Sequence, residues 1–377
     1  MSIIYLDNAA TTQIDTKVIE RITEVMTNVH GNPSSTHQVG RKAKSVVEAA
    51  RKSIAKHFNV TAGEVVFTAG GSEADNLILR NAIVHLGVQR IITTKIEHHA
   101  VLHTIEALAE EFNITIDFLE LDERGVVNYS QIEALLNSNK EKTLVSLMSV
   151  NNELGNILDS TKVSDLCIAH KAFFHSDTVQ AIGHYAMDLR EVPIDFITAS
   201  AHKFHGPKGV GFAIFKKGFG IKPMLIGGEQ ERGARAGTEN VPQIAGMEIA
   251  LDIALENEEI DKTYITNLKK HFINQIKSEL PTLEFNGCSA DLEHSSYTIL
   301  NVRFPKELPM LLFQLDLKGV AASGGSACQS GSAKGSHVLE AILPEHKVKS
   351  TSVRFSFSKY NTLKEIDQVV EVLKSLV

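Results

Sequence analysis

The sequence has few cysteines and no long apolar run. Its 377 residues include three widely spaced cysteines, Cys167, Cys288 and Cys328, which do not form a disulfide framework. Free thiols in odd number are typical of a reducing compartment, so we expect a cytoplasmic protein. No apolar stretch approaches the ~18 residues that a membrane span needs. The start, MSIIYLDNAATT, lacks the basic and then apolar segments of a secretory signal. We therefore expect neither a membrane protein nor a secreted one.

An excess of positive charge is also missing. The chain has 38 Lys and Arg against 45 Asp and Glu, which gives a net charge of −7. Binding to a nucleic-acid backbone needs clustered positive charge, so we expect no nucleic-acid partner. No cysteine or histidine pair has zinc-finger spacing, and we expect no metal site. With 43% hydrophobic and 22% charged residues, the composition is that of a globular protein with an ordinary core.

Short apolar runs alternate with segments of helical periodicity through most of the chain. In the segment 38–58, apolar residues recur on one face of a helix. Strands are expected at 64–68, 90–94, 114–119, 144–150, 173–174 and 194–198. Strands that alternate with helices predict an α/β fold, with a mainly parallel sheet covered on both faces.

The pattern changes after Gly246. A long helix with one break is expected through 247–279, followed by strand-like pieces and a last helix. Thr362 and Glu365 have the spacing of a capping box that opens this last helix. The length suggests two domains. We predict a large domain of residues 13–258 and a smaller α+β domain built from residues 1–12 and 259–377.

Polar residues follow five of the predicted strands. They are Gly71-Ser72-Glu73, Glu97-His98-His99, Asn151-Asn152-Glu153, Asp177 with Gln180, and Ser200-Ala201-His202-Lys203. Each group alone has an ordinary interpretation, since an Asp after a strand is often a helix cap. In open α/β sheets, however, ligands bind beyond the carboxyl ends of the strands. The joint placement predicts one cleft with an anion-binding helix start, two histidines, amides, an acid and a lysine.

Lys203 is the most informative of these residues. The segment SAHKFHGPKG places it just past a buried strand, among glycine, proline and histidine. A lysine that is desolvated in a cleft can form a Schiff base. A Schiff-base lysine, a phosphate site at a helix start and an acid for a pyridinium nitrogen together describe pyridoxal phosphate chemistry. The sequence therefore predicts pyridoxal 5′-phosphate as the cofactor.

Ten short motifs occur in a fixed order along nearly the whole chain. They are YLDNAATT at 5–12, GNPSS at 31–35, FTAGGSEADN at 67–76, EHHAV at 97–101, VNNELG at 150–155, HSDTVQAIG at 175–183, SAHKFHGPKGVG at 200–211, ERGARAGTEN at 231–240, GSACQSG at 325–331 and VRFSFS at 353–358. In this order they resemble the cysteine desulfurases of the class V aminotransferase family. The resemblance implies the fold of pyridoxal-phosphate-dependent transferases, which is like that of aspartate aminotransferase.

The resemblance also implies a role for each matching residue. Lys203 would hold the cofactor covalently, His98 would stack on its ring, Asp177 would pair with the ring nitrogen and Gln180 with the ring hydroxyl. The cofactor site would be completed by Gly71, Ser72, Asn152, Ser200, His202 and, from the other subunit of a homodimer, Thr238. The substrate would be bound by Asn32, Asn152 and Arg354. The catalytic residues would be Lys203, His98 and Cys328.

The implied activity is conversion of L-cysteine to L-alanine, with a persulfide formed on Cys328. The glycine- and serine-rich segment 323–332 is expected to be a mobile loop that carries Cys328. By contrast, Cys167 is expected in the core and Cys288 in a loop without a role. The persulfide would pass to a sulfur-acceptor protein, an iron–sulfur scaffold or a sulfur carrier. Iron–sulfur cluster assembly and tRNA thiolation both remain open, in part because the chain ends at Val377, before the docking segment of longer relatives.

Two other functions remain as alternatives. A selenocysteine lyase or a plain class V aminotransferase would use the same cofactor, and a plain aminotransferase would not need Cys328. A non-catalytic homologue is the third possibility, although the retained Lys203, Asp177, His98 and Cys328 argue against it.

Overall fold

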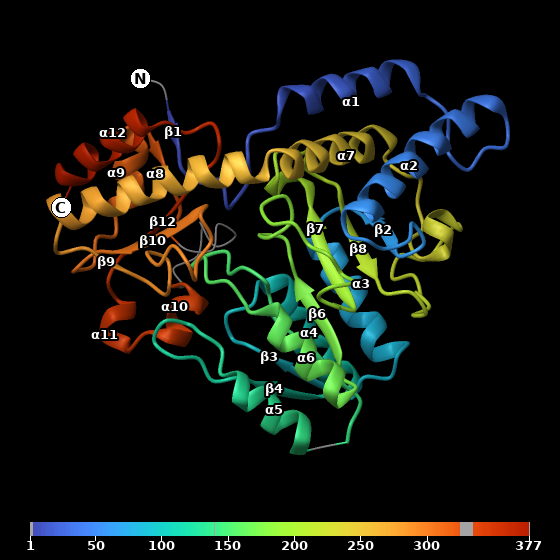
Figure 1. The fold of residues 1–377 in the computed structure, drawn as a ribbon, viewed down its shortest axis with the longest axis horizontal. Coiled ribbons are helices and arrows are strands. Elements are labelled where there is room, and N and C mark those ends of the chain that lie inside the picture. Colours follow the sequence, from blue (N-terminus) through green and yellow to red (C-terminus); the bar gives the residue numbers. More distant parts are fainter. Residues whose placement is uncertain (1–2, 139, 325–334, 377) are drawn as a thin grey trace.

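The computed structural model describes residues 3–138, 140–324 and 335–376. Figure 1 shows two units side by side, a larger one built around a long sheet and a smaller one that contains the C-terminal part of the chain. Helices α7 (Val241–Glu256) and α8 (Glu258–Glu279) follow one another from the larger unit into the smaller one. The expected long helix is thus confirmed, with its break at Asn257.

A seven-stranded sheet forms the centre of the larger unit. In spatial order its strands are β2 (Val65–Thr68), β8 (Gly211–Phe215), β7 (Phe196–Ser200), β6 (Phe173–Asp177), β5 (Thr143–Ser146), β3 (Arg90–Thr93) and β4 (Thr115–Phe118). All neighbours are parallel except that β8 runs antiparallel to both β2 and β7. Most of these strands are buried along their whole length, as expected for a sheet that is covered on both faces.

Helices cover the two faces of this sheet and enclose a separate core on each. One core includes residues of α1 (Thr16–Asn28), α2 (Gln38–His57), α6 (Ser160–His170) and α7. The other core includes residues of α3 (Gly71–Val84) and α4 (His99–Phe112). Helix α5 (Tyr129–Ser138) packs beside α6. The mainly parallel α/β architecture predicted from the sequence is therefore confirmed.

The smaller unit has its own sheets and its own core. Strands β12 (Ser352–Ser356), β10 (Ile299–Arg303) and β9 (Glu284–Phe285) form an antiparallel sheet. Strand β1 (Ile4–Tyr5) pairs in parallel with β11 (Val320–Ala321). The helices of this unit are α8, α9 (Leu311–Leu317), α10 (His337–Ile342), α11 (Glu345–Val348) and α12 (Leu363–Lys374).

The core of the smaller unit joins the two ends of the described chain. Ile4 and Leu6 pack in the same cluster as Phe272, Phe355 and Val369. We propose that the two units are domains, bounded as residues 13–258 and as residues 1–12 with 259–377.

Some element boundaries differ from those expected. The strand expected at 144–150 ends at Ser146, although the backbone continues beside β6, with Ser149 donating to the carbonyl of Asp177. Strand β8 was not predicted, because its run GFAIF follows β7 without the helix that the alternating pattern leads one to expect. The capping box of Thr362 and Glu365 is confirmed at the start of α12.

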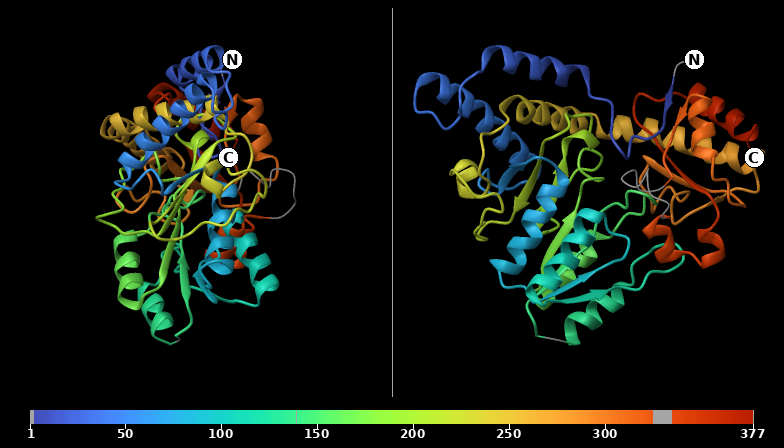
Figure 2. Two further views of the ribbon diagram at one scale, coloured as in Figure 1. Left: turned by 90° about the vertical axis from the view of Figure 1, so that its right-hand side faces the viewer. Right: turned by 180° about the vertical axis from the view of Figure 1, so that it is seen from behind.

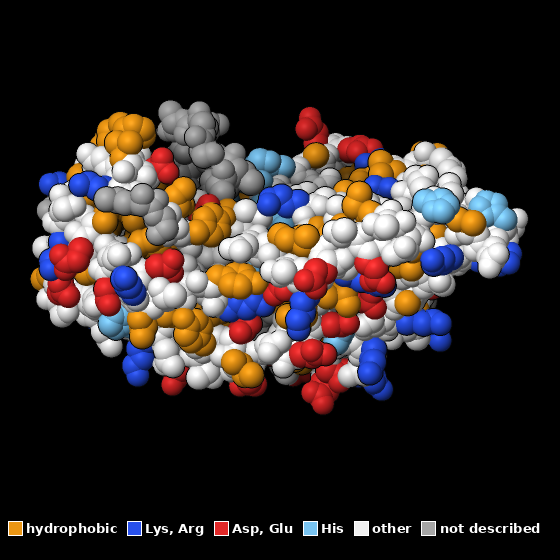
Figure 3. Space-filling view, turned by 90° about the horizontal axis from the view of Figure 1, so that it is seen from above, with side chains coloured by type: hydrophobic (Ala, Val, Ile, Leu, Met, Phe, Trp, Pro, Cys, Tyr) orange, Lys and Arg blue, Asp and Glu red, His pale blue; other side chains and the backbone are white. Residues whose placement is uncertain are grey.

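Two observations concern the helices and the surface of the described chain. None of the helices in the described part of the chain is long and apolar enough to cross a membrane. On the face shown in Figure 3, Lys and Arg side chains are interspersed with Asp and Glu.

The view from behind in Figure 2 shows the smaller unit packed against one side of the larger unit. The ends of β6 and β7 are near this junction, and a cavity opens there.

Candidate active site

A cavity of about 210 Å³ lies between the ends of β6 and β7 and the smaller unit. Side chains from distant parts of the chain line it, as the strand-end rule predicts. The predicted site residues that line it are Gly71, Ser72, His98, Asn152, Asp177, Gln180, Ser200, His202, Lys203 and Arg354. The structure thus brings together predicted site residues from Gly71 to Arg354, which are 283 positions apart in sequence.

One end of the cavity is suited to an anion. Helix α3 begins there after Gly70, which has no side chain to cap the first backbone amides. Ser72, Ser200 and His202 lie beside this helix start and also line an adjoining open cavity of about 460 Å³. Burial lowers the pKa of His202 to about 4, so its imidazole is neutral at pH 7. Its buried Nδ1 has no hydrogen-bond partner among the described residues. A helix start with a hydroxyl pair and a free imidazole nitrogen can hold a phosphate group.

Gly71 allows α3 to approach the loop that follows β6. A Cβ atom built on Gly71 would lie 2.7 Å from Cγ2 of Val179, closer than real side-chain contacts. The absence of a side chain at this position therefore sets how close the helix start comes to the end of β6.

Asp177 places a buried carboxylate at the end of β6. It is 5% exposed, and its Oδ1 accepts hydrogen bonds from the backbone amide of Val179, at 2.9 Å, and from Thr198 Oγ1, at 3.4 Å. These donors fix the orientation of the carboxylate toward the cavity. Such an acid can pair with a protonated ring nitrogen of a ligand.

His98 caps the start of α4 and also faces the cavity. Its Nδ1 accepts a hydrogen bond from the backbone amide of Ala100 at 3.1 Å. Burial lowers the pKa of His98 even though Asp177 acts in the opposite direction, so the ring is neutral at pH 7. Because Nδ1 is an acceptor, the proton of the neutral ring is on Nε2.

Lys203 reaches the cavity from the short 3-10 helix η1 (Ala201–Lys203), directly after β7. Its Nζ donates to the carbonyl oxygens of Ala9, at 2.6 Å, and Ala10, at 3.0 Å. Gln180 Nε2 donates to the same Ala9 carbonyl at 2.9 Å. The N-terminal segment therefore positions Lys203. The residues next to Lys203 in the sequence do not predict this contact.

Arg354 comes from β12 of the smaller unit and is 1% exposed. Nη1 donates to the carbonyl of Asn152 at 2.8 Å, and Nη2 pairs with Oδ1 of Asp7 at 2.9 Å. The buried Nε has no partner among the described residues. A rigid guanidinium with a spare donor at the edge of a cavity can bind a carboxylate.

Two predicted site residues in the described part of the chain, Thr238 and Asn32, do not line this cavity. Thr238 is exposed and does not line it within its own chain. Asn32 is also exposed, and its Oδ1 accepts a hydrogen bond from the backbone amide of Ser34 in the loop after α1. Cys328 lies outside the described residues, as does most of the loop expected at 323–332. The roles given to these residues stay predictions.

The sequence analysis gave no role to two buried acids beside the site, although it named Glu97 in one of its strand-end groups. Asp75 lines the cavity at 1% exposure, and its Oδ1 lies 3.4 Å from Nε2 of the buried His175. Burial and the charge of Asp177 raise the pKa of Asp75 well above its usual range. The other acid is Glu97, also 1% exposed, which directly precedes His98. A signal existed for Asp75, because it stands one helical turn before the buried Ile78 on an apolar face of α3.

The other two cysteines are free and buried. Cys167 packs in the core of the larger unit, as predicted, and burial raises its pKa far above the usual value. Cys288 lies beside Arg124 in a loop of the smaller unit, and burial raises its pKa as well. Neither residue lines the cavity that contains Lys203.

Comparisons with known proteins agree with this geometry. The model of the class-V aminotransferase family matches residues 4–369. A cysteine desulfurase, IscS, of Clostridium botulinum is 39% identical over 99% of this chain and 94% of the relative. The solved structure of a NifS-like protein superposes with a TM-score of 0.90, at 34% identity, over 99% of this chain and 98% of that one. A structure of SspA in complex with cysteine superposes with a TM-score of 0.78, at 28% identity, over 95% of this chain and 99% of that one. The chain therefore belongs to the class-V aminotransferase family.

Proposed function

We propose that this protein is a cysteine desulfurase that converts L-cysteine to L-alanine and keeps the sulfur as a persulfide on Cys328. The observation that carries the proposal is the convergence of Lys203, Asp177, His98 and Arg354 on one cavity. Full-length relatives named cysteine desulfurase and a structural neighbour bound to cysteine support it.

The residues of the cavity fit pyridoxal 5′-phosphate. The start of α3, with Ser72, Ser200 and the unpartnered Nδ1 of His202, provides the donors that a phosphate needs. Asp177 provides the carboxylate for a ring nitrogen, and Lys203 the amine for the aldehyde. When bound, this cofactor supplies a protonated ring that accepts the electron pair released at the α-carbon of an amino acid.

The side chains around the cofactor site would divide the remaining tasks. Arg354 and Asn152 would hold the substrate carboxylate at the edge of the smaller unit, which fixes the α-carbon over the site. The amine of Lys203 would accept the proton from the α-carbon of the substrate. His98, neutral and protonated at Nε2, would provide an N–H donor at the cavity that it lines with Asp177. The closely packed N-terminal segment of Ala9 and Ala10 would exclude water behind the lysine.

The atoms and electrons of the sulfur transfer balance with Cys328 and L-cysteine as the two reactants. The Cys328 thiolate attacks the sulfur of L-cysteine, the carbon–sulfur bond breaks, and protons return to the carbon so that alanine leaves. One thiol and one cysteine thus give one persulfide and one alanine. We further propose that the enzyme is a cytoplasmic homodimer and that a sulfur-acceptor protein, such as an iron–sulfur scaffold, receives the persulfide.

The proposal is tested by measuring alanine and sulfide from L-cysteine in the presence of a reductant. Cys328→Ser should lower alanine formation by more than about 100-fold, because the sulfur then has no nucleophile to attack it. Cys288→Ser is the matched control and should leave the rate unchanged. If Cys328→Ser still forms alanine and sulfide, a lyase that needs no nucleophilic cysteine replaces the persulfide mechanism. If purified protein shows no cofactor absorbance after addition of pyridoxal phosphate, a non-catalytic role replaces all of these activities.

A further inference from the structure

Helix α10 belongs to the smaller unit by its place in the chain, but it packs on the larger unit. Its buried side chains form an apolar cluster with residues of the larger unit, and this cluster is separate from the core of the smaller unit. The members are Val338, Leu339 and Ile342 from α10, and Ile96 and Leu154 from the larger unit. Leu121, in the loop after β4, packs against the same cluster (Figure 1). A helix of six residues is too short to be stable alone, so these contacts fix its position.

Ser336 attaches the start of α10 to the turn that contains Asn152. Ser336 caps the helix, and its Oγ donates to Oε2 of Glu153 at 2.5 Å. Glu153 is 0% exposed, and Asn151 holds the turn around it, since Asn151 Oδ1 accepts hydrogen bonds from two backbone amides of the turn. A buried carboxyl oxygen is costly to leave without a donor, so the contact with Ser336 is a strong one.

His337 attaches the same helix to the turn that precedes α4. Its Nε2 donates to the carbonyl oxygen of Glu97 at 3.0 Å. Its ring lies beside the ring of His99, with 4.2 Å between the two centroids. Glu97 and His99 flank His98 in the chain, and His98 lines the candidate active site together with Asn152. The first residues of α10 are therefore attached to two turns of that site.

The chain on the other side of Cys328 is attached to the same site. Ser323 and Arg354 form an antiparallel bridge, in which the amide of Arg354 donates to the carbonyl of Ser323 at 2.7 Å. Arg354 lines the candidate active site. Cys328 stands five positions after Ser323 and eight positions before Ser336. Because a residue spans at most about 3.6 Å, the two attachment points limit how far the thiol can lie from the cavity.

We propose that Ser336 and His337 are positioning residues for the sulfur transfer, because they fix the point at which the chain leading from Cys328 is attached to the active-site turns. The inference rests on the proposed function and deepens it. A tethered group reacts faster when its attachment points lie beside its target. Neither Ser336 nor His337 lines the cavity itself, so loosening α10 should slow persulfide formation without slowing the binding of L-cysteine.

The test separates two steps of a single turnover by the cofactor-loaded enzyme, with enzyme in excess over L-cysteine and no reductant. The change in visible absorbance on mixing measures binding of L-cysteine, and mass spectrometry of quenched samples measures the persulfide on Cys328. Ser336→Asp keeps a residue type that caps helices but places a carboxylate against Glu153. We expect the persulfide to form at least about tenfold more slowly than in wild type, with the absorbance change at the wild-type rate.

The double variant Ser336→Asp with Glu153→Gln tests the contact itself. The introduced amide can donate to the introduced carboxylate, so persulfide formation should return to within about threefold of the wild-type rate. Glu153→Gln alone should stay near wild type, because the hydroxyl of Ser336 can donate to an amide oxygen. His337→Phe keeps a ring beside His99 but cannot donate to the Glu97 carbonyl. It should also slow persulfide formation, which tests the proposal even if Ser336→Asp does not fold.

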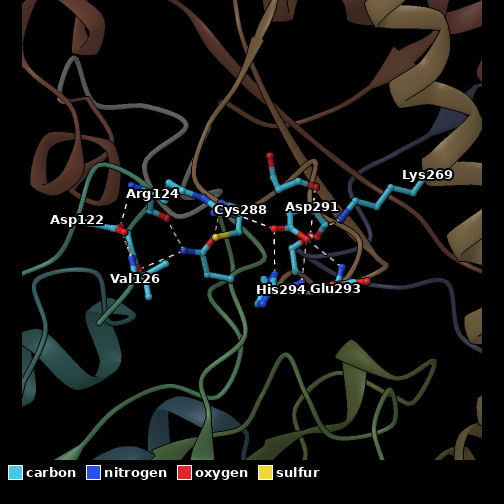
Figure 4. Close-up of polar contacts among 12 residues, drawn as sticks. Asp122, Arg124, Val126, Lys269, Cys288, Asp291, Glu293 and His294 are labelled. Carbon is cyan, nitrogen blue, oxygen red and sulfur yellow. Dashed lines mark hydrogen bonds and ion pairs between the residues drawn. The ribbon is translucent and has the colours of Figure 1, made fainter. Parts of the chain in front are cut away.

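Asp291→Asn is the matched control, since it weakens a contact between the two units outside α10. Figure 4 shows Arg124 of the larger unit beside Asp291 of the smaller unit, with 2.8 Å between Nη2 and Oδ2. This variant should form the persulfide at the wild-type rate, and an equal loss there would overturn the positioning role. A wild-type rate for Ser336→Asp, an equally slowed absorbance change, or no recovery in the double variant would overturn it as well.

The same experiment distinguishes failure of this role from failure of the proposed function. A wild-type rate for His337→Phe would overturn the role of His337 alone. A wild-type enzyme that forms no persulfide on Cys328 would overturn the proposed function, and the positioning role with it.

Discussion

Arg354 holds its charge in the protein interior at the point where the two units meet. Its guanidinium is fixed by the Asn152 carbonyl and by Asp7, its buried Nε has no hydrogen-bond partner among the described residues, and the residue lines the cavity. Lysine is a point charge and cannot keep these contacts while binding a carboxylate with two donors. The contacts of the Arg354 guanidinium should therefore affect the affinity for the substrate carboxylate.

We predict that Arg354→Lys raises KM for L-cysteine by about 10-fold or more, because a hydrogen bond to a charged group contributes about 1.5–3 kcal/mol. Steady-state kinetics of alanine formation measures this. The control is Arg303→Lys on the neighbouring strand β10, since Arg303 is also buried but pairs with Asn286 and does not line the cavity. A KM for Arg354→Lys within twofold of the value for Arg303→Lys would contradict the assignment.

The placement of helix α3 depends on a single glycine at its start, Gly71. Its start must lie close to the loop after β6 for the phosphate donors and Asp177 to face one cavity. Alanine in a helix normally stabilises relative to glycine by about 0.5–1 kcal/mol. At Gly71, however, the added Cβ meets Val179 Cγ2 at 2.7 Å, so crowding opposes the helical preference.

We predict that Gly71→Ala lowers the free energy of unfolding by about 1–3 kcal/mol, as overpacking in a close contact does. Urea unfolding of the protein measures this, and titration with pyridoxal phosphate shows whether the cofactor affinity falls as well. The double variant Gly71→Ala with Val179→Ala removes the crowding methyl groups and should recover most of the loss relative to Val179→Ala alone. No recovery in the double variant would show that the cost has another origin.

At the scale of the whole molecule, buried histidines make stability depend on pH. His175 is 0% exposed in the middle of the sheet, with Nδ1 2.9 Å from Ser146 Oγ. Burial lowers its pKa from 6.5 to about 3. Between these values the unfolded chain binds a proton that the folded protein does not, so acid favours unfolding. Above pH 6.5 neither state is protonated at this residue, and its contribution to stability is constant.

We therefore predict that the free energy of unfolding falls as the pH decreases below 6.5, with up to about 1.4 kcal/mol per pH unit from His175. Urea unfolding between neutral pH and pH 5 measures the slope. His175→Gln should flatten it, and the exposed His346→Gln should not. Equal slopes for wild type and His175→Gln would show that other groups control acid stability.

The proposed dimer leads to a further prediction at this scale. Thr238 is exposed and outside the cavity of its own chain, which fits a residue that acts in the site of a partner subunit. Lys203→Ala and Thr238→Ala would each impair both sites of a homodimer. In a mixed dimer, one site would carry both changes and the other would be intact.

Co-expression of the two variants should therefore restore roughly a quarter of the wild-type alanine formation, since half of randomly paired dimers have one intact site. The assay uses limiting pyridoxal phosphate, so that the Thr238→Ala defect is visible. Activity no higher than the average of the two separate variants would place Thr238 in the site of its own chain, or in none.

Much of the candidate site could be predicted from local sequence. Ser72, His98 and Lys203 each follow a buried strand within a few residues, Asp177 ends one, and parallel strands bring their carboxyl ends to one edge. Arg354 was predicted from the family motifs alone, because it lies within β12 and does not follow a strand of the large sheet. By contrast, the contacts of Lys203 with the carbonyls of Ala9 and Ala10 join residues more than 190 positions apart and have no local pattern.

The sequence by itself therefore determined the alternation of helices and strands, the parallel sheet and the chemical types at its edge, because periodicity and turn residues act over short distances. The tertiary structure decided the contacts that depend on packing between distant segments. These are the antiparallel insertion of β8, the pairing of β1 with β11 and the burial of Asp75 and Glu97 beside Asp177. The cost of burying a charge depends on everything that surrounds it, so the protonation of these acids is a property of the folded molecule.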